Sequence, residues 1–172
     1  MKYKVLNIKG AVLVQEQLEK YLEKLASDHV LQEKSDKETY PIPRMKENFE
    51  VISETYHLLN EHIKLKIPIH SAGEWLLDNY YAIEESIKSI EKDLTLKKYT
   101  NFLGIANGPY RGFARIYVLA TEIIAYTDSK ISAKSLEQYL KAYQQKKTLS
   151  MDEIWSIGIF LQIAIIENIR NI

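Results

Sequence analysis

The acidic residues are the first candidates for chemistry, because sugar or phosphoryl transfer from an activated nucleotide usually needs carboxylates that hold a divalent metal. The sequence contains no Asp-x-Asp pair. Glycoside hydrolysis needs two carboxylates that flank one bond. Glu84 and Glu85 are adjacent, and adjacent residues of a helix face different directions, so they do not form such a pair. The acidic residues therefore predict no catalytic site in this segment.

The histidines and serines give no stronger signal for catalysis. His57 and His62 lie about 140° apart on a helix, so a shared metal is not expected. Ser71 and Ser150 each stand three residues before a glutamate, which is the capping-box pattern of a helix start. The sequence has neither a G-x-x-x-x-G-K-[ST] nor a G-x-G-x-x-G phosphate loop. We therefore expect no metal and no cofactor in this segment.

Composition describes a neutral chain of the size of one domain, residues 1–172, with 46% hydrophobic residues. Lysine plus arginine and aspartate plus glutamate number 23 each, which disfavours nucleic acid as a partner. Cysteine is absent, as is common in a reducing compartment. The longest uncharged stretch, 154–166, is shorter than the about 20 residues of a membrane span, so it predicts a buried helix and no span.

Apolar residues recur at intervals of three and four, which predicts an all-α fold of about six helices in one orthogonal or irregular bundle. The expected helices cover 12–31, 44–64, 71–94, 113–126, 133–145 and 150–172. Asn107-Gly108-Pro109 predicts a long loop between 94 and 112. Helix 113–126 is apolar over more than half of its circumference and should lie centrally. The last expected helix is not followed by a glycine, asparagine or proline that would end it. We therefore expect a fragment or an N-terminal module of a larger chain.

Helix 71–94 carries Asn79 and Glu84 at the margin of its apolar stripe. A carboxylate at such a margin needs a cation or several donors. We therefore expect Glu84 and Asn79 to join a polar network that docks this helix on helices 113–126 and 150–172, and Glu84→Ala to cost a few kcal/mol if Glu84 is paired and buried. A ligand or partner site is the alternative interpretation of these two residues. The candidate network or interaction residues are Asp78, Asn79, Glu84, Arg111, Arg115, Glu167, Asn168 and Arg170.

The twelve tyrosines lie mostly on the apolar stripes of the expected helices. Their positions favour core residues with one polar tip. A tyrosine-lined groove that stacks sugars is the alternative interpretation.

Three stretches, 72–94, 108–129 and 136–170, resemble the segment near the N-terminus of cyclic β-1,2-glucan synthases in their order and spacing. The resemblance extends from Gln15 to Ile172. Ala114 stands where the family pattern has proline, so the start of helix 113–126 is expected to be looser. The residues that carry the resemblance are Glu74 to Asn79, Gly108, Pro109, Gly112, Arg115, Tyr117, Ala142 to Gln144, Glu153, Trp155, Glu167, Asn168 and Arg170.

The resemblance implies a large bacterial inner-membrane enzyme that polymerises glucose from UDP-glucose, with UDP-glucose and a divalent metal bound outside this segment. The segment would be a non-catalytic accessory or regulatory domain at the cytoplasmic face, and its partners would be other domains of the same polypeptide. None of the family's transferase motifs occurs here, so no catalytic residue carries over. Two alternatives stay open. One is a module that binds carbohydrate or a nucleotide sugar through tyrosines and polar residues around the loop Lys97–Arg111, and the other is a free-standing helical adaptor for protein partners.

Overall fold

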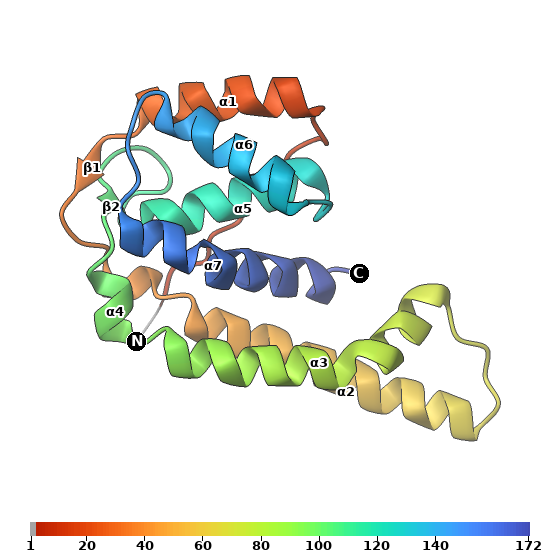
Figure 1. Cartoon of the computed structure of the whole chain (residues 1–172). Helices are drawn as coiled ribbons and strands as arrows, with labels where there is room; N and C mark the ends of the chain where they lie inside the picture. Colours follow the sequence, from red (N-terminus) through yellow and green to blue (C-terminus); the bar gives the residue numbers. More distant parts are fainter. Residues whose placement is uncertain (1–2) are drawn as a thin grey trace.

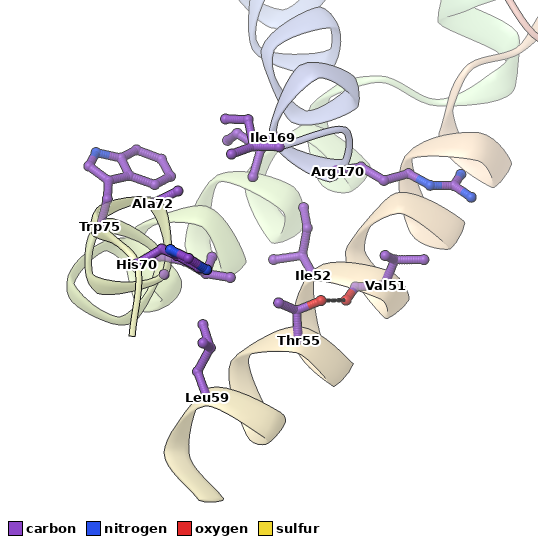
Figure 2. Close-up of a pocket in the computed structure, with 12 residues that line it drawn as sticks. Val51, Ile52, Thr55, Leu59, His70, Ala72, Trp75, Ile169 and Arg170 are labelled. Carbon is purple, nitrogen blue, oxygen red and sulfur yellow. Dashed lines mark hydrogen bonds between the residues drawn. The ribbon is translucent and has the colours of Figure 1, made fainter. Parts of the chain in front are cut away.

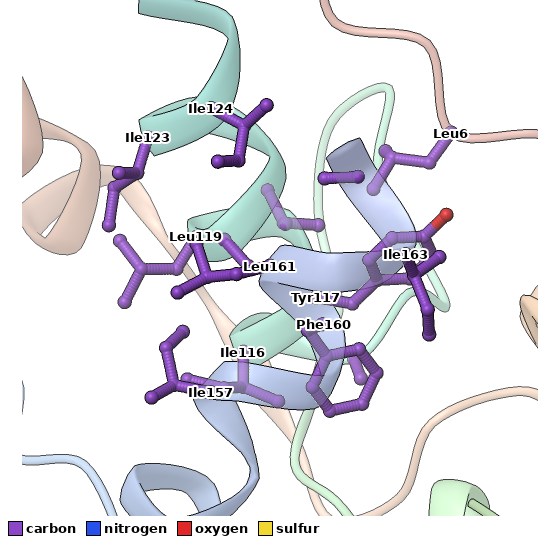
Figure 3. Close-up of a cluster of buried hydrophobic side chains, with 14 of the residues drawn as sticks. Leu6, Ile116, Tyr117, Leu119, Ile123, Ile124, Ile157, Phe160, Leu161 and Ile163 are labelled. Carbon is purple, nitrogen blue, oxygen red and sulfur yellow. The ribbon is translucent and has the colours of Figure 1, made fainter. Parts of the chain in front are cut away.

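Helices α5 (Arg115–Thr127) and α7 (Met151–Arg170) pack against each other in the middle of the molecule (Figure 1). The computed structural model describes residues 3–172. Ile116, Leu119 and Ile123 of α5 are fully buried in the cluster around Phe160 of α7 (Figure 3). Each such aliphatic side chain contributes about 1.5 to 3 kcal/mol on burial. The predicted central position of helix 113–126 and the predicted buried helix at 154–166 are both confirmed.

Two further helix pairs lie on opposite sides of this middle pair (Figure 1). On one side, α1 (Gln15–Asp28) packs on α6 (Ala133–Gln144). On the other side, α2 (Ile42–Lys64) and α3 (Ser71–Asp93) form an antiparallel hairpin that contacts α7. The end of the hairpin that contains residues 64–71 projects beyond the other helices (Figure 1). We call the hairpin, residues 42–93, the arm.

The predicted loop between 94 and 112 is more ordered than expected. It contains the short helix α4 (Leu96–Thr100), whose first turn is capped by the Thr95 hydroxyl, and the strand β2 (Gly104–Ile105). Strand β2 pairs antiparallel with β1 (Leu31–Gln32), and a 3₁₀ turn, η1, follows at Lys37–Thr39. Gly112 has φ +90°, and a Cβ there would meet the Asp36 carboxylate, so this turn needs glycine.

The all-α prediction is confirmed, with six long helices and the short α4 among residues 3–172. The first helix is shorter than its predicted range 12–31, because Val14 and His29 are already extended. The capping box of Ser150 and Glu153 is confirmed, whereas that of Ser71 is wrong: Ser71 is already the first helical residue, and the N-cap is His70, without a side-chain hydrogen bond. Within residues 3–172, no helix combines the length and the apolar character needed to cross a membrane.

The start of α5 is held in place although Ala114 replaces the proline of the family pattern. Ala114 has φ −57°, a value that proline also adopts. Its N–H, which proline lacks, donates to the Tyr99 hydroxyl at 3.0 Å, and both residues are fully buried. A hydrogen bond thus holds the chain at the start of α5, where a proline ring would otherwise fix φ.

Candidate functional site

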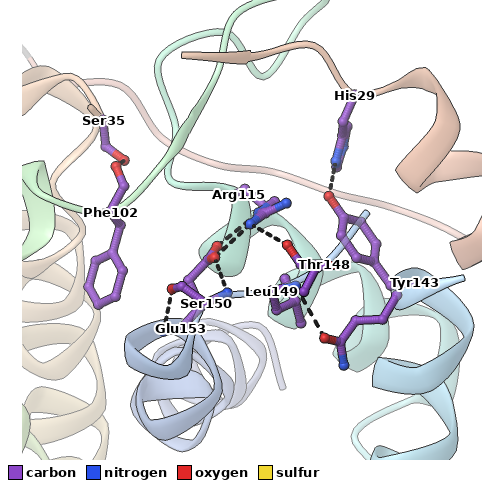
Figure 4. Close-up of polar contacts among 10 residues, drawn as sticks. His29, Ser35, Phe102, Arg115, Tyr143, Thr148, Leu149, Ser150 and Glu153 are labelled. Atoms are coloured by element: carbon purple, nitrogen blue, oxygen red, sulfur yellow. Dashed lines mark hydrogen bonds and ion pairs between the residues drawn. The ribbon is translucent and has the colours of Figure 1, made fainter. Parts of the chain in front are cut away.

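A buried ion pair joins α5 to α7. Arg115 Nε donates to Glu153 Oε2 at 2.9 Å, and Arg115 Nη2 donates to Glu153 Oε1 at 2.6 Å (Figure 4). The two side chains are only 2% and 1% exposed. Nη2 also donates to the Thr148 carbonyl at 3.1 Å, and Glu153 Oε1 accepts from the Ser150 N–H at 2.9 Å. The same carboxylate therefore neutralises a buried cation and caps α7.

His29 and Tyr143 extend this ion pair towards α1 and α6. His29 Nδ1 lies 2.8 Å from the Tyr143 hydroxyl (Figure 4), and the Arg115 guanidinium lies 5.8 Å from the centre of the Tyr143 ring. Burial, helped by the charge of Arg115, lowers the pKa of His29 to about 4. Burial likewise raises the pKa of Tyr143 to about 12. Both groups are neutral at pH 7, and they connect four helices through the core.

A second polar cluster docks α7 on α2. Arg44 donates to both oxygens of Glu167, at 3.0 and 2.7 Å, and the Asn48 amide donates to one of them. Arg170 then donates to Asn48 Oδ1 at 2.9 Å. Burial alone would raise the pKa of Glu167, but the hydrogen bonds from Arg44 and Asn48 outweigh it and hold that pKa below its usual value. This bidentate arrangement is the geometry in which arginine binds a carboxylate most strongly.

The eight residues of the predicted network are divided among several places. Glu167 and Arg170 meet at the cluster between α2 and α7, whereas Asn168 donates to Ser129 at 3.0 Å. Arg115 pairs with Glu153, and Arg111 donates to the Ala106 carbonyl within its own loop at 2.8 Å. Several of the eight residues therefore make polar contacts, but these contacts lie in separate places and do not form one network around Glu84.

The contacts of Asn79 and Glu84 do not support their predicted role in docking α3 on α5 and α7. Glu84 pairs with Lys88 one turn later at 3.2 Å, and Asn79 donates to the Trp75 carbonyl at 2.8 Å. Asp78 is exposed. The reason is the position of α3 at the edge of the molecule, where it packs mainly on α2 and leaves the margin of its apolar stripe in water. Neither side chain reaches Arg111, Arg115 or Arg170.

Replacement of Glu84 by alanine should therefore change the free energy of unfolding by less than about 0.5 kcal/mol, because an exposed i,i+4 ion pair is worth only that much. Urea denaturation of both proteins, followed by far-ultraviolet circular dichroism, measures this difference. Lys88→Ala is the matched control and should give the same small value. A loss of several kcal/mol would restore the docking role of Glu84.

The sequence analysis did not predict the roles of Arg44 and Asn48 or the pairing of Glu153 with Arg115. The signal for the last of these was available, because an arginine in a helix that is apolar nearly all round must be paired. Glu153 had already been explained as a cap, so its second role was overlooked. Arg44 and Asn48 lie on α2 beside the core stripe and resemble ordinary surface residues of a helix.

Glu122 of α5 is a further buried acid. It is 2% exposed, and the Tyr21 hydroxyl donates to its Oε2 at 3.0 Å. Burial raises the pKa of Glu122 to about 7. The Tyr21 ring packs against Tyr126, with their centres 4.8 Å apart. This carboxyl thus titrates near neutral pH inside the contact between α1 and α5.

A groove of about 330 Å³ lies between α2, the start of α3 and the end of α7 (Figure 2). Its walls are mainly aliphatic, and Trp75, 45% exposed, stands at its side. Polar groups are few: the Thr55 hydroxyl already bonds the Val51 carbonyl, Arg170 is engaged with Asn48, and His70 is the third polar lining residue. The groove therefore suits an apolar group better than a polar one.

Stacked aromatic rings stiffen the arm beside this groove. Tyr80 lies between Phe49 and Tyr56, with centres 5.8 and 3.9 Å apart and interplanar angles of 17° and 9°. The Tyr80 hydroxyl is hydrogen-bonded to Ser53 at 2.9 Å. Most tyrosines pack in the core as the sequence analysis favoured, but Tyr81 is 70% exposed. The arm is thus an ordered structure that carries an open aromatic and aliphatic surface.

Comparison with known proteins gives one informative relative. No family model matches the chain. The chain is similar to the cyclic β-(1,2)-glucan synthase NdvB of Rhizobium meliloti (strain 1021), with 28% identity over 130 residues. The match covers 75% of this chain and 4% of NdvB, so the chain spans a small fraction of that protein's length. This similarity supports a relationship between the chain and the cyclic β-1,2-glucan synthases.

Proposed function

We propose that the chain is a non-catalytic helical accessory domain of a cyclic β-1,2-glucan synthase-type glycosyltransferase. The similarity to NdvB over three quarters of the chain carries this proposal. In this role the domain docks on other domains of the same polypeptide, at the cytoplasmic face of an inner-membrane enzyme. UDP-glucose and the divalent metal belong to the transferase part of that enzyme.

The contacts of one buried and one half-buried ion pair support an organising role. Arg115 with Glu153, and Arg44 with Glu167, each join two helices by paired hydrogen bonds. A buried cation and carboxylate that neutralise each other hold two helices in one relative position. The arm adds a surface that other protein segments can contact, because it is ordered by stacked rings and carries exposed apolar side chains.

A chimera of NdvB tests the proposal. The matching NdvB segment is either deleted or replaced by this chain, and glucose incorporation from UDP-glucose into β-1,2-glucan is measured in membranes that contain equal amounts of each protein. We expect deletion to lower incorporation by about tenfold or more, and this chain to restore a large part of it. An unrelated helical domain of equal length is the control and should restore nothing. Full incorporation after deletion would refute the accessory role.

Carbohydrate binding is the second candidate, favoured by Trp75 at the side of the groove. The few free polar groups there argue against it, because sugar hydroxyls need hydrogen-bond partners. In a Trp155→Phe background, Trp75 is the remaining tryptophan, so its fluorescence reports binding at the groove. An unchanged emission spectrum on titration with UDP-glucose and β-1,2-glucooligosaccharides would remove this candidate.

A further inference from the structure

Asn107 connects the loop 106–112 to the end of α1. Its Oδ1 accepts a hydrogen bond from the Val30 N–H at 2.9 Å, and its Nδ2 donates to the Asp28 carbonyl at 3.0 Å. Beside them, the Ala106 N–H donates to the Val30 carbonyl at 2.7 Å. The side-chain amide of Asn107 thus offers one donor and one acceptor, as a peptide unit does, and it extends the pairing of β1 with β2 as far as α1.

This junction between α1 and the loop depends on the amide group of Asn107. An ionised carboxylate at the same position accepts a hydrogen bond from Val30 but has no proton to donate to Asp28. It also places two acceptor oxygens opposite each other, because the partner at this point is the Asp28 carbonyl. That carbonyl belongs to the last turn of α1, where carbonyls have no partner within the helix. Conversion of Asn107 to an acid therefore weakens the junction.

The residue that follows Asn107 makes this asparagine chemically labile. An asparagine loses its side-chain amide when the backbone nitrogen of the next residue attacks its Cγ, and a large side chain on that next residue hinders the attack. Here the next residue is Gly108, which has no side chain. The other seven asparagines precede isoleucine, phenylalanine, tyrosine or glutamate. Asn107 is therefore the asparagine whose sequence most favours this reaction.

The structure leaves the reacting groups accessible. Asn107 and Gly108 are both exposed, and the Gly108 N–H has no backbone hydrogen-bond partner in the part of the chain that the structure describes. A Cβ at Gly108 would meet nothing within 4 Å, so the space around this residue is open. The Val30 N–H donates to the Asn107 oxygen on which negative charge develops during the attack, and such a donor stabilises that charge.

We propose that Asn107 is a site of spontaneous deamidation, and that the reaction loosens the junction between α1 and the loop 106–112. The Gly108 nitrogen bonds to Asn107 Cγ, the bond from Cγ to Nδ2 breaks, and ammonia leaves with the proton of the Gly108 N–H, which gives a cyclic succinimide. Water then opens the ring to aspartate or to isoaspartate. Water is the only co-reactant, and neither product keeps the amide that donates to Asp28. This inference is independent of the proposed function.

Peptide mapping of the aged protein tests the chemistry. The purified chain is kept at 37 °C and pH 8 for several weeks and digested at mildly acidic pH, where the reaction is slow. Mass spectrometry then detects the gain of one mass unit at each deamidated asparagine, and labelling by isoaspartyl methyltransferase detects isoaspartate. We expect Asn107 to react about tenfold faster or more than any other asparagine, because Gly108 does not hinder the attack. Asn101 is the internal control, since it is also exposed but precedes Phe102.

The variant Asn107→Asp tests the structural consequence, because it carries one of the two products from the start. It should unfold at a lower urea concentration than the unmodified chain. Its Ala106 amide hydrogen, which bonds Val30 across the junction, should exchange with solvent about fivefold faster or more, because the junction opens more often. The matched control is Asn101→Asp, which adds the same charge at an exposed position just after α4 and should leave both measurements close to those of the unmodified chain.

Two results would overturn the inference. Deamidation of Asn101, or of another asparagine, as fast as that of Asn107 would show that Asn107 is not the reactive site. Equal urea midpoints and equal Ala106 exchange in the two aspartate variants would show that the junction does not depend on the amide. The aged protein provides the same comparison without a variant, because ion-exchange chromatography separates the deamidated fraction by its extra negative charge. Ala106 should exchange faster in that fraction than in the intact fraction of the same sample.

Discussion

Replacement of Arg115 by alanine should lower the free energy of unfolding by about 3 to 5 kcal/mol, because it leaves the Glu153 carboxylate buried without its cation. The effect is large because neither side chain has access to water: they are 2% and 1% exposed. The Thr148 carbonyl also loses a donor, and α7 loses the charge balance at its cap. A loss of this size removes a large part of the total stability of a small domain.

Urea denaturation monitored by circular dichroism at 222 nm measures this loss. Glu153→Ala should cost a similar amount, and the double variant should cost clearly less than the sum of the two, since the removal of both charges leaves neither one unpaired. Arg111→Ala is the control of the same residue type: Arg111 is exposed and donates to one loop carbonyl, so it should cost less than about 1 kcal/mol. Equal losses for Arg111 and Arg115 would contradict the assigned role of the ion pair.

Glu122 and His29 should give the stability of the protein two opposite dependences on pH. The pKa of Glu122 rises from 4.5 to about 7 on folding, so its folded form binds the proton more tightly and stability falls as pH rises from 4.5 to 7. The pKa of His29 falls from 6.5 to about 4 on folding, so stability falls as pH drops from 6.5 to 4. Each effect amounts to about 3 kcal/mol when complete.

Between pH 4.5 and 6.5 the contributions of Glu122 and His29 to the free energy of unfolding offset each other. The substitution Glu122→Gln removes the first contribution and leaves that of His29 to be measured alone. The variant resembles the protonated acid, so at pH 8 it should be more stable than the unmodified protein, by up to about 3 kcal/mol. Below pH 6.5 its stability should fall with decreasing pH, because the contribution of His29 is no longer offset. Urea titrations at intervals between pH 4 and 8.5 give both profiles. Glu50→Gln, at an exposed position of α2, should reproduce the unmodified profile, and an identical profile for Glu122→Gln would show that Glu122 is ionised normally.

The helices were predictable because their signals are local. The apolar stripe of α3 identifies Leu76, Tyr80, Ile83, Ile87 and Ile90 as the buried face, and the structure buries all five. The capping box at Ser150 likewise depends only on residues three apart. Strands β1 and β2 were missed because each contains two residues, too few for an alternating pattern, and their partners lie more than 70 residues apart.

The polar contacts were less predictable, because their partners depend on which helices become neighbours. On the sequence, Glu84 and Glu153 are both acids near apolar residues of a helix. One belongs to α3 at the edge of the molecule and pairs with Lys88, and the other faces α5 in the middle and pairs with Arg115. The groove was also missed, because its walls come from α2, α3 and α7, and no segment alone contains its pattern.

The pairing of α1 with α6 determines when the protein can fold during its synthesis. Leu18 and Leu22 of α1 are fully buried, but more than 100 residues separate α1 from its neighbour α6. At about 5 to 20 residues per second, a ribosome needs on the order of 10 s to complete the intervening chain. Throughout that interval α1 lacks its partner α6, although α5, whose Glu122 accepts a hydrogen bond from Tyr21, is completed shortly before α6. The contact between α1 and α6 thus joins segments far apart in the sequence, and such non-local contacts form more slowly than those between sequential helices.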